Sequence, residues 1–272
     1  MRLPVARPWI DAVRAIAVLV LLPLAATSAA SASDAVETIA KVKPSVVAIG
    51  TFERERSPPF QFRGTGFAVG NGTTIVTNAH VLPGVLDSAR LESLAILTPG
   101  TSADTVQIRK ARPVSMDREH DLALIRIDGA PLPVLKLRDS DSVHEGQEVL
   151  ITGFPIGAIL GPFPATHRGM ISAITPIAIP QRTAAELDPA VVNRLTRGTF
   201  PVFQLDATTY PGSSGSPIYD PSTGEVLGIV NMTFVKGTKE SALSEPSGIT
   251  YAVPARHLEA LLRDAFPDAS RK

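Results

Sequence analysis

The feature that most constrains the fold is a long succession of short apolar runs, each bounded by turn residues. The runs recur from residue 46 to residue 254, and most of them hold five to seven residues rich in Val, Ile, Leu, Thr or Phe. Gly or Pro stands in most of the connections. Regularly spaced short strands of this kind are typical of a β-sandwich or β-barrel, whereas strands alternating with helices would indicate a parallel sheet. The chain is therefore expected to be all-β.

A polar stretch, residues 139–147 (DSDSVHEGQ), divides these runs into two groups. The expected strands before it are VVAIG, GTGFAVG, TTIVTNAHVL, SLAILTP, ALIRI and LPVLKL, and those after it are VLITGFP, GMISAI, PVFQL, VLGIVNM and GITYAVP. The length of 272 residues suits one large domain or two small ones with shared packing. The polar stretch gives a boundary between a domain over residues 33–143 and another over residues 144–272.

Three segments depart from the strand pattern. Residues 34–43 place apolar side chains at helical spacing, and Pro44 ends this short helix just before the first strand. Residues 183–197 have some helical character, interrupted by Pro189, and are interpreted as an insertion between strands. Residues 254–266 begin with Pro and gather Leu and Phe near one face, which is typical of a terminal amphipathic helix packed on the body.

The N-terminal segment differs in composition from the rest of the chain. Basic residues precede an apolar run over residues 15–24, and a small-residue stretch, AATSAASAS, follows. That order predicts a signal peptide over residues 1–32, cleaved near Ala30 or Ala32. The apolar run is shorter than the about 20 residues that a membrane span needs. The working domain is therefore expected to be exported, periplasmic or extracellular, with a membrane tether only if the signal stays uncleaved.

Composition excludes several classes of function. The 26 basic and 26 acidic residues cancel, so the chain has no electrostatic footprint for nucleic acid or for an anionic membrane surface. The absence of cysteine excludes disulfides, thiolate metal sites and a cysteine nucleophile. No sequence feature indicates an oligomeric state. The histidines stand at no spacing typical of a metal site, so neither a metal nor a cofactor is expected; they are His80, His120, His144, His167 and His257.

The segment YPGSSGSP, residues 210–217, places three serines and two glycines between two prolines. Gly, Ser and Pro make ordinary surface turns. A serine that attacks a carbonyl group, however, needs a base at its hydroxyl, backbone N–H groups aimed at the developing oxyanion and an unobstructed approach. Gly212 and Gly215 leave the approach to Ser214 clear. We interpret the segment as a loop that presents the Ser214 hydroxyl.

Two further side chains suit a nucleophilic mechanism. His80 ends the apolar run TTIVTNAHV, where a side chain emerges at the edge of a strand in a fixed orientation. Asp121 opens the run HDLALIRI, and Asp117 and Asp128 are alternatives nearby. Each of these residues alone is as readily structural. The ordered set His, Asp and Ser in an all-β chain nevertheless indicates catalysis by a serine nucleophile.

At these segments the sequence resembles the trypsin-fold serine proteases, and within them the bacterial HtrA (Deg) type. The resemblance covers nearly all of the chain after the signal segment, through GTGFAVGNGTTIVTNAHVL, MDREHDLALIRI, ITGFPIG, HRGMISAI, FQLDATTYPGSSGSPIYD, GEVLGIVNM and SGITYAVPARHL. It implies two six-stranded β-barrels with the active site between them, a closing C-terminal helix, and hydrolysis of peptide bonds in proteins or peptides through an acyl-enzyme.

Residue by residue, the resemblance assigns a role to each candidate. Ser214 becomes the nucleophile and His80 the general base that later protonates the leaving amine. Asp121, which the resemblance favours over Asp117, orients the imidazole and stabilises its charged form. The backbone N–H groups of Gly212 and Ser214 are expected to form the oxyanion hole.

The substrate pocket is carried over by the same resemblance. Thr208 is expected at its floor, with Asn231, Met232, Thr233, Gly248 and Thr250 in its walls. No charged side chain stands among these residues, so we expect a preference for a small or medium uncharged side chain at the cleavage position. The pocket of glutamyl endopeptidases is lined by a histidine, whereas this sequence has Val230 and Asn231 at the corresponding strand. We therefore do not expect a preference for an acidic residue at the cleavage position.

The sequence also departs from its relatives. Ser213 precedes the nucleophile, where digestive trypsin-like enzymes have an aspartate that traps a new N-terminus. The sequence ends just after the expected terminal helix, so we expect no PDZ domain of the kind that many HtrA proteins carry.

Two other functions remain open from the sequence. The first is a protease-fold binding or chaperone-like protein with latent or absent hydrolytic activity. The second is an esterase of the α/β-hydrolase fold, which is disfavoured because there the chain order is Ser, acid, His and helices alternate with strands.

Overall fold

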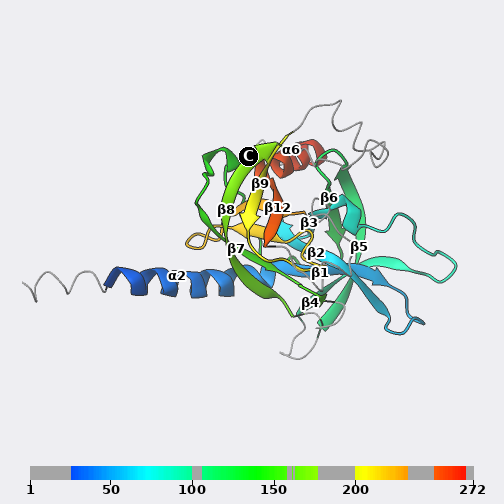
Figure 1. The fold of residues 1–272 in the computed structure, drawn as a ribbon. Helices are drawn as coiled ribbons and strands as arrows, with labels where there is room; N and C mark the ends of the chain where they lie inside the picture. Colours follow the sequence, from blue (N-terminus) through cyan, green and yellow to red (C-terminus); the bar gives the residue numbers. More distant parts are fainter. Residues whose placement is uncertain are drawn as a thin grey trace, which may run out of the picture.

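Two closed β-barrels make up the body of the protein (Figure 1). The computed structural model describes residues 26–99, 106–157, 161, 163–176, 200–231 and 248–267, with side chains from residue 34 onward. The strand orders are β1-β2-β3-β6-β5-β4 in the first barrel and β10-β11-β12-β9-β8-β7 in the second. The expectation of an all-β protein with two six-stranded barrels and a C-terminal helix is confirmed.

The first barrel is antiparallel throughout, and its strands are β1 (Val46–Phe52), β2 (Phe60–Val69), β3 (Thr74–Asn78), β4 (Ser93–Pro99), β5 (Val106–Asp117) and β6 (Leu122–Ile127). Strand β1 shows why the run VVAIG contains no polar residue. Val47 and Ile49 point into the barrel, where they join its interior core. Val46 and Ala48 point the other way, into the core shared by the two barrels. Because side chains alternate along a strand, burial of both faces requires a continuous apolar run.

The second barrel repeats this arrangement with strands β7 (Glu148–Gly153), β8 (Ala165–Pro176), β9 (Pro201–Asp206), β10 (Pro217–Tyr219), β11 (Val226–Val230) and β12 (Ile249–Pro254). Its interior core includes Val149, Ile151, Phe203 and Leu205. The core shared by the barrels takes Phe67, Val76 and Leu124 from the first and Leu150, Tyr219, Ile229 and Val253 from the second. The two barrels therefore form one packed body.

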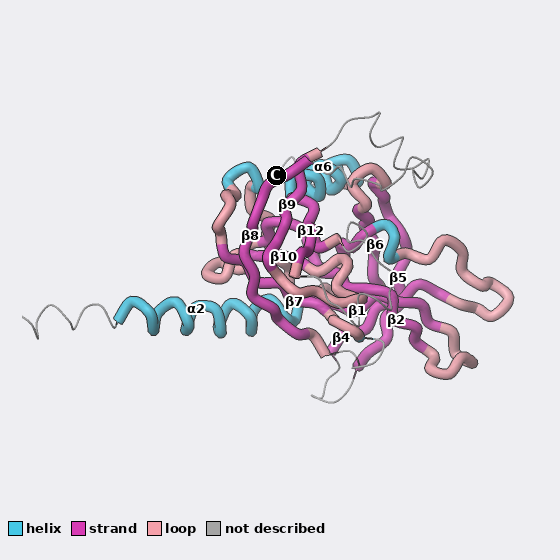
Figure 2. Tube along the Cα trace, viewed as in Figure 1, coloured by secondary structure: helices cyan, strands magenta, loops and turns pink. Residues whose placement is uncertain are grey.

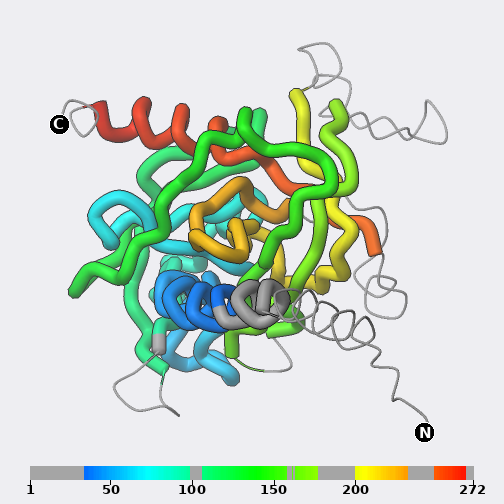
Figure 3. Tube along the Cα trace, turned by 90° about the vertical axis from the view of Figure 1, so that its left-hand side faces the viewer, coloured from blue at the N-terminus to red at the C-terminus, as the bar shows by residue number. Residues whose placement is uncertain are grey.

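Two longer helices flank this body, and they lie apart from each other (Figures 2 and 3). Helix α2 (Ala26–Val42) projects from the barrels, longer than the helix expected over residues 34–43, and a short 3₁₀ turn, η1 (Lys43–Ser45), leads from it into β1. Helix α6 (Ala255–Ala265) buries Leu258 and Leu261 against the shared core. None of the helices in the described part of the chain is both long and apolar enough to cross a membrane.

Some expected strands differ from the observed ones. The run LPVLKL forms no ladder; it crosses between the barrels, and within it only Leu137 makes an isolated bridge, to Val226. Strand β5 was not expected, because most of its side chains are exposed or half-buried and its sequence lacks an apolar run. The three-residue strand β10 was also missed. The insertion expected at residues 183–197 lies outside the described residues.

Candidate active site

The pairing of β3 with β6 sets the position of the candidate histidine. Asn78, the last residue of β3, pairs with Leu122, the first residue of β6. The contact continues beyond the strands, because the N–H of Ala79 (3.0 Å) and the side-chain amide of Asn78 (3.1 Å) both donate to the carbonyl oxygen of Asp121. His80 follows in a single 3₁₀ turn, η2 (Ala79–Val81), and therefore lies opposite Asp121.

His80 and Asp121 make two hydrogen bonds to each other. The Nδ1 atom of His80 lies 2.6 Å from Oδ2 of Asp121, and the backbone N–H of His80 donates to Oδ1 at 2.9 Å. The Asp121 side chain is 13% exposed and that of His80 is 32% exposed. In the tautomer whose Nδ1 donates to the carboxylate, the Nε2 lone pair is left to accept a proton.

A third donor to this carboxylate comes from the second barrel. Asn231 follows β11, is fully buried, and donates from Nδ2 to Oδ2 of Asp121 at 2.9 Å. The resemblance implies a place for Asn231 in the pocket wall, and in the structure its side-chain amide faces the Asp–His pair. A polar residue directly after a buried strand was the signal for this contact, but nothing in the sequence identified its partner.

The YPGSSGSP segment forms a compact loop between β9 and β10. The N–H of Ser213 donates to the carbonyl oxygen of Tyr210 (2.9 Å), that of Ser216 to Ser213 (3.0 Å), and that of Gly215 to Val230 (3.0 Å). Val230 precedes Asn231, so the loop that carries Ser214 is bonded to the strand end that reaches Asp121. The structure thus brings the loop of Ser214 and the His80–Asp121 pair to the same junction of the barrels.

Thr65 of β2 holds this loop from the side of the first barrel. Its N–H donates to the carbonyl oxygen of Ser214 at 2.8 Å, and its hydroxyl donates to the carbonyl oxygen of Gly212 at 2.7 Å. The same hydroxyl accepts a hydrogen bond from the N–H of Phe154 at 3.1 Å. One threonine therefore fixes both ends of the Gly212–Ser214 tripeptide.

The two glycines of the loop are required by conformation and by space. Gly212 has φ +104° and Gly215 has φ +87°, values at which other residues are strained. A Cβ on Gly212 would lie 2.6 Å from the Phe154 carbonyl oxygen and 2.6 Å from the Phe62 ring, and one on Gly215 would collide with the Thr65 carbonyl oxygen. The glycines therefore allow the loop to pack tightly against the first barrel.

The backbone N–H groups of Gly212 and Ser214 donate no hydrogen bond to any described residue. Gly212 is half-buried and Ser214 is buried, so these two N–H groups beside the serine are left for water or another external acceptor. Ser214 as a whole residue is only 6% exposed.

The remaining pocket candidates are only partly described. Thr208 is exposed, and the carbonyl oxygen of Gly248 accepts from the N–H of Ala207 at 3.0 Å. Thr250 is buried, with its hydroxyl 2.7 Å from that of Thr209 and donating to the carbonyl oxygen of Ala207 at 2.9 Å. Met232 and Thr233 lie outside the described residues.

The alternative aspartates are directed elsewhere. Asp117 bonds His120, with Oδ2 2.6 Å from Nδ1, and Asp128 bonds Arg109 through its backbone carbonyl oxygen. Of the candidate acids only Asp121 reaches His80 in the described structure. Among the described residues no group of three or more His, Asp or Glu side chains is arranged to hold a metal ion.

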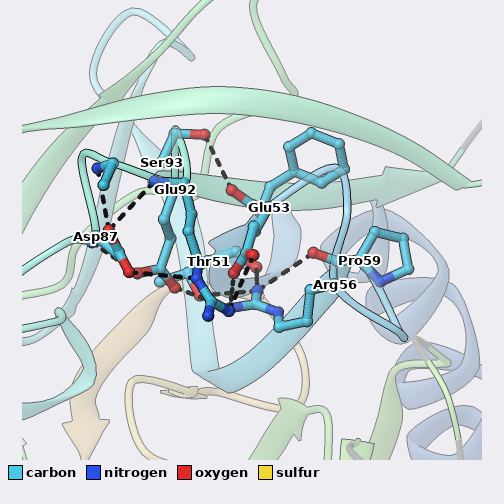
Figure 4. Close-up of polar contacts among 10 residues, drawn as sticks. Thr51, Glu53, Arg56, Pro59, Asp87, Glu92 and Ser93 are labelled. Atoms are coloured by element: carbon cyan, nitrogen blue, oxygen red, sulfur yellow. Dashed lines mark hydrogen bonds and ion pairs between the residues drawn. The ribbon is translucent and has the colours of Figure 1, made fainter.

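A polar network braces the chain that follows His80 (Figure 4). Arg56, in the turn between β1 and β2, binds Oε1 of Glu92 at 2.9 Å and the carbonyl oxygen of Thr51 at 2.7 Å. Hydrogen bonds from Thr51, from the N–H of Asp87 and from Arg56 hold the pKa of Glu92 at about 2. Directly after His80, the carbonyl oxygen of Val81 accepts a hydrogen bond from Nε of Arg63 in β2 at 2.7 Å. The segment on the C-terminal side of His80 is thus anchored to β1 and β2.

Comparison with known proteins identifies relatives of this chain. The family described as a trypsin-like peptidase domain matches residues 64–229. A probable periplasmic serine endoprotease, DegP-like, of Halomonas elongata is 31% identical over 70% of this chain and 32% of its own length. A DegP-like protein of Marinomonas is 27% identical over 74% and 36%, and serine protease HTR4 of Bos taurus is 29% identical over 83% and 40%. The chain thus spans about a third of the length of the first curated relatives it matches.

Solved structures show the same fold. The serine endoprotease of Yersinia pestis superposes with a TM-score of 0.59 at 22% identity, over 86% of this chain and 67% of that one. The active form of a protease from M. tuberculosis gives a TM-score of 0.58 at 22% identity, over 83% and 82%. The family match over more than half of the chain, together with the DegP-like relatives, shows that the chain belongs to the trypsin-like peptidase family and, within it, to the HtrA type of serine protease.

Proposed function

We propose that the protein is an exported serine endopeptidase that cleaves protein substrates with His80, Asp121 and Ser214. The observation that carries this proposal is the His80–Asp121 pair, whose carboxylate also accepts from Asn231 on the strand end that binds the Ser214 loop. These contacts support a shared site for three residues that lie far apart in the sequence.

In the proposed reaction the Ser214 hydroxyl oxygen attacks the substrate carbonyl carbon while Nε2 of His80 takes the hydroxyl proton. Asp121 stabilises the imidazolium that forms, and the N–H groups of Gly212 and Ser214 bind the oxyanion. The imidazolium then gives its proton to the leaving amine as the peptide C–N bond breaks. Water then gives a proton to the same imidazole as its oxygen attacks the acyl carbon. The bond from that carbon to the Ser214 oxygen breaks, the imidazolium returns the proton to Ser214, and the acyl group leaves as a carboxylic acid.

Substrate preference and location belong to the same proposal. With Thr208, which is exposed, as the proposed pocket floor and no charge among the candidate wall residues, we expect an uncharged residue at the cleavage position. Relatives named as periplasmic endoproteases support export, with residues 1–32 as the signal peptide. A peptide-library profile dominated by Arg, Lys or Glu at the cleavage position would overturn the pocket assignment.

The experiment that tests the proposal combines labelling by a fluorophosphonate probe with casein cleavage, using the purified protein and the Ser214→Ala variant. Labelling at Ser214 and cleavage that is lost in the variant would establish the peptidase. A folded protein that is neither labelled nor active would support the alternative of a binding or chaperone-like protein, because a fluorophosphonate reacts only with an activated serine.

A further inference from the structure

A second histidine–aspartate pair lies directly beside the first one along the chain. His120, the residue before Asp121, places Nδ1 2.6 Å from Oδ2 of Asp117. The other oxygen of Asp117 accepts from the N–H groups of Glu119 (2.9 Å) and His120 (3.1 Å). One carboxylate therefore holds the whole turn that joins β5 to β6, and this turn ends at Asp121.

Aromatic rings from the second barrel cover this turn. The ring of His120 stacks on that of His257 in α6, with centroids 3.9 Å apart and planes inclined by 25°. Phe200, which precedes β9, presents its ring edge-on to both, at 4.5 Å from His120 and 5.2 Å from His257. Among the described residues Nε2 of His257 is buried with no hydrogen-bond partner. The turn before Asp121 is thus held by the terminal helix.

The backbone of Asp121 needs such support. Its φ is +55°, in the left-handed region that residues with a side chain seldom adopt. A conformation of this kind persists only where surrounding contacts determine it. The described contacts are the pairing of its carbonyl oxygen with Asn78 and Ala79 on one side, and the Asp117–His120 turn on the other.

We propose that His120 is a positioning residue for Asp121. Bonded to Asp117 and packed between His257 and Phe200, it holds the turn in the conformation in which the Asp121 carboxylate meets His80, and it links the first barrel's catalytic acid to the helix that ends the second barrel. The inference rests on the proposed function, because it takes Asp121 to be the catalytic acid.

Charge in the cluster supports this arrangement. Two neutral imidazole rings can stack on each other, whereas two protonated rings would repel each other. Burial lowers the pKa of His257 to about 4, and positive charge on His120 and on Arg256 acts in the same direction, while Asp117 and Asp141 oppose it. These groups face His257 from the β5–β6 turn, from the 3₁₀ turn η3 (Ser140–Ser142) and from α6 itself. His257 is therefore neutral at neutral pH and keeps the stack uncharged on that side.

The kinetic test compares three substitutions in the full chain. His120→Ala removes both the bond to Asp117 and the stack, and we expect kcat to fall by about tenfold to a hundredfold with KM little changed, because misplacing a catalytic group by about 1 Å has effects of that size. His120→Phe keeps the stack and should retain more of kcat than His120→Ala. His144→Ala, at an exposed histidine between the barrels, is the matched control and should behave as the parent protein. Equal kcat for His120→Ala and the parent would overturn the proposal.

A second readout does not depend on activity. In the Ser214→Ala protein, the NMR resonance of the His80 Nδ1 proton reports the bond to Asp121. We expect His120→Ala to shift or broaden this resonance and His144→Ala to leave it unchanged; an unchanged resonance in a folded His120→Ala protein would refute the positioning role. His120→Phe serves if the alanine variant does not fold. A parent protein that shows this resonance and its dependence on His120 but is not labelled at Ser214 would refute the proposed function and leave the positioning role standing.

Discussion

At the scale of the residue, the proposed mechanism depends on the Asp121 carboxylate, which would orient His80 to act as a base. The carboxylate accepts from the backbone and Nδ1 of His80 and from Asn231. Asp121→Asn would offer an amide donor to Nδ1 and stabilise the wrong tautomer, so we expect kcat to fall by about four orders of magnitude, as in other Ser-His-Asp enzymes. Asp128→Asn is the control, since Asp128 is exposed and its backbone carbonyl makes its bond to Arg109. Steady-state kinetics on one peptide would compare them, and a fully active Asp121→Asn protein would disprove the assignment.

A second residue-scale prediction concerns Asn231. Asn231→Ala removes a buried donor to the Asp121 carboxylate and leaves that oxygen less well satisfied, and a hydrogen bond to a charged group contributes about 1.5–3 kcal/mol. We therefore expect a lower denaturation midpoint together with reduced kcat/KM. Asn71→Ala makes the same change at an exposed asparagine that bonds only its own turn, through Thr73. If the two variants had equal activity and stability, the contact of Asn231 with Asp121 would have no energetic importance.

The residues differ in how far sequence could identify them. The order His80, Asp121, Ser214 was predicted from motifs, because His80 lies at the end of one apolar run, Asp121 at the start of another, and Ser214 within a Gly- and Ser-rich turn segment. The choice between Asp121 and Asp117 needed the family resemblance, since both precede the same strand. The contact of Asn231 with Asp121 was not predictable, because it joins residues 110 positions apart in different barrels.

At the scale of the element, the Ser214 loop depends on β2 as well as on its own turn residues. Thr65→Val keeps the side-chain shape but removes the hydroxyl that bonds Gly212 and Phe154. Leaving these backbone groups unpaired should cost about 1–3 kcal/mol of stability and lower kcat, because the Gly212 peptide borders the proposed oxyanion hole. Thr65→Ser restores the hydroxyl and should recover most of both quantities. Urea denaturation and single-turnover acylation would measure them, and a Thr65→Val protein with parental kcat would show that the loop is held without this bond.

Strands were predictable from sequence where both of their faces are buried, as in β1, because burial demands continuous apolar residues. Strand β5 was not predicted, because it is held by long-range pairing with β4 and β6. Most of its side chains are exposed or half-buried, so its sequence has no local apolar pattern. The run LPVLKL gave the opposite error, because a strand was predicted there and no strand formed. Leu135 and Leu137 pack in the core shared by the barrels, while the backbone of the run bonds single groups such as the carbonyl oxygens of Gly72 and Ala68.

At the scale of the whole molecule, the barrels are joined without disulfides, by an apolar core and by α6. Arg256 of α6 binds Asp141 at 2.7 Å, and Arg126 of β6 lies 5.3 Å from the centroid of the Phe266 ring. His257 adds the stack on His120. The two-barrel division followed from the resemblance rather than from spacing alone, and the role of α6 in joining the barrels required the structure.

This arrangement predicts how the stability of the molecule depends on pH. The folded-state pKa of His257, about 4, lies below the ordinary histidine value of 6.5, so the unfolded chain binds more protons between these values. Stability contributed by the neutral side chain is therefore present above about pH 6.5 and is lost as pH falls toward 4, by at most about 3 kcal/mol. His257→Phe keeps a ring in the stack and cannot take up a proton, so in the Ser214→Ala background its melting temperature should fall less steeply across that window than that of Ser214→Ala alone. Parallel curves for the two proteins, measured by calorimetry in the same buffers, would show that α6 is held to the first barrel without a titrating His257.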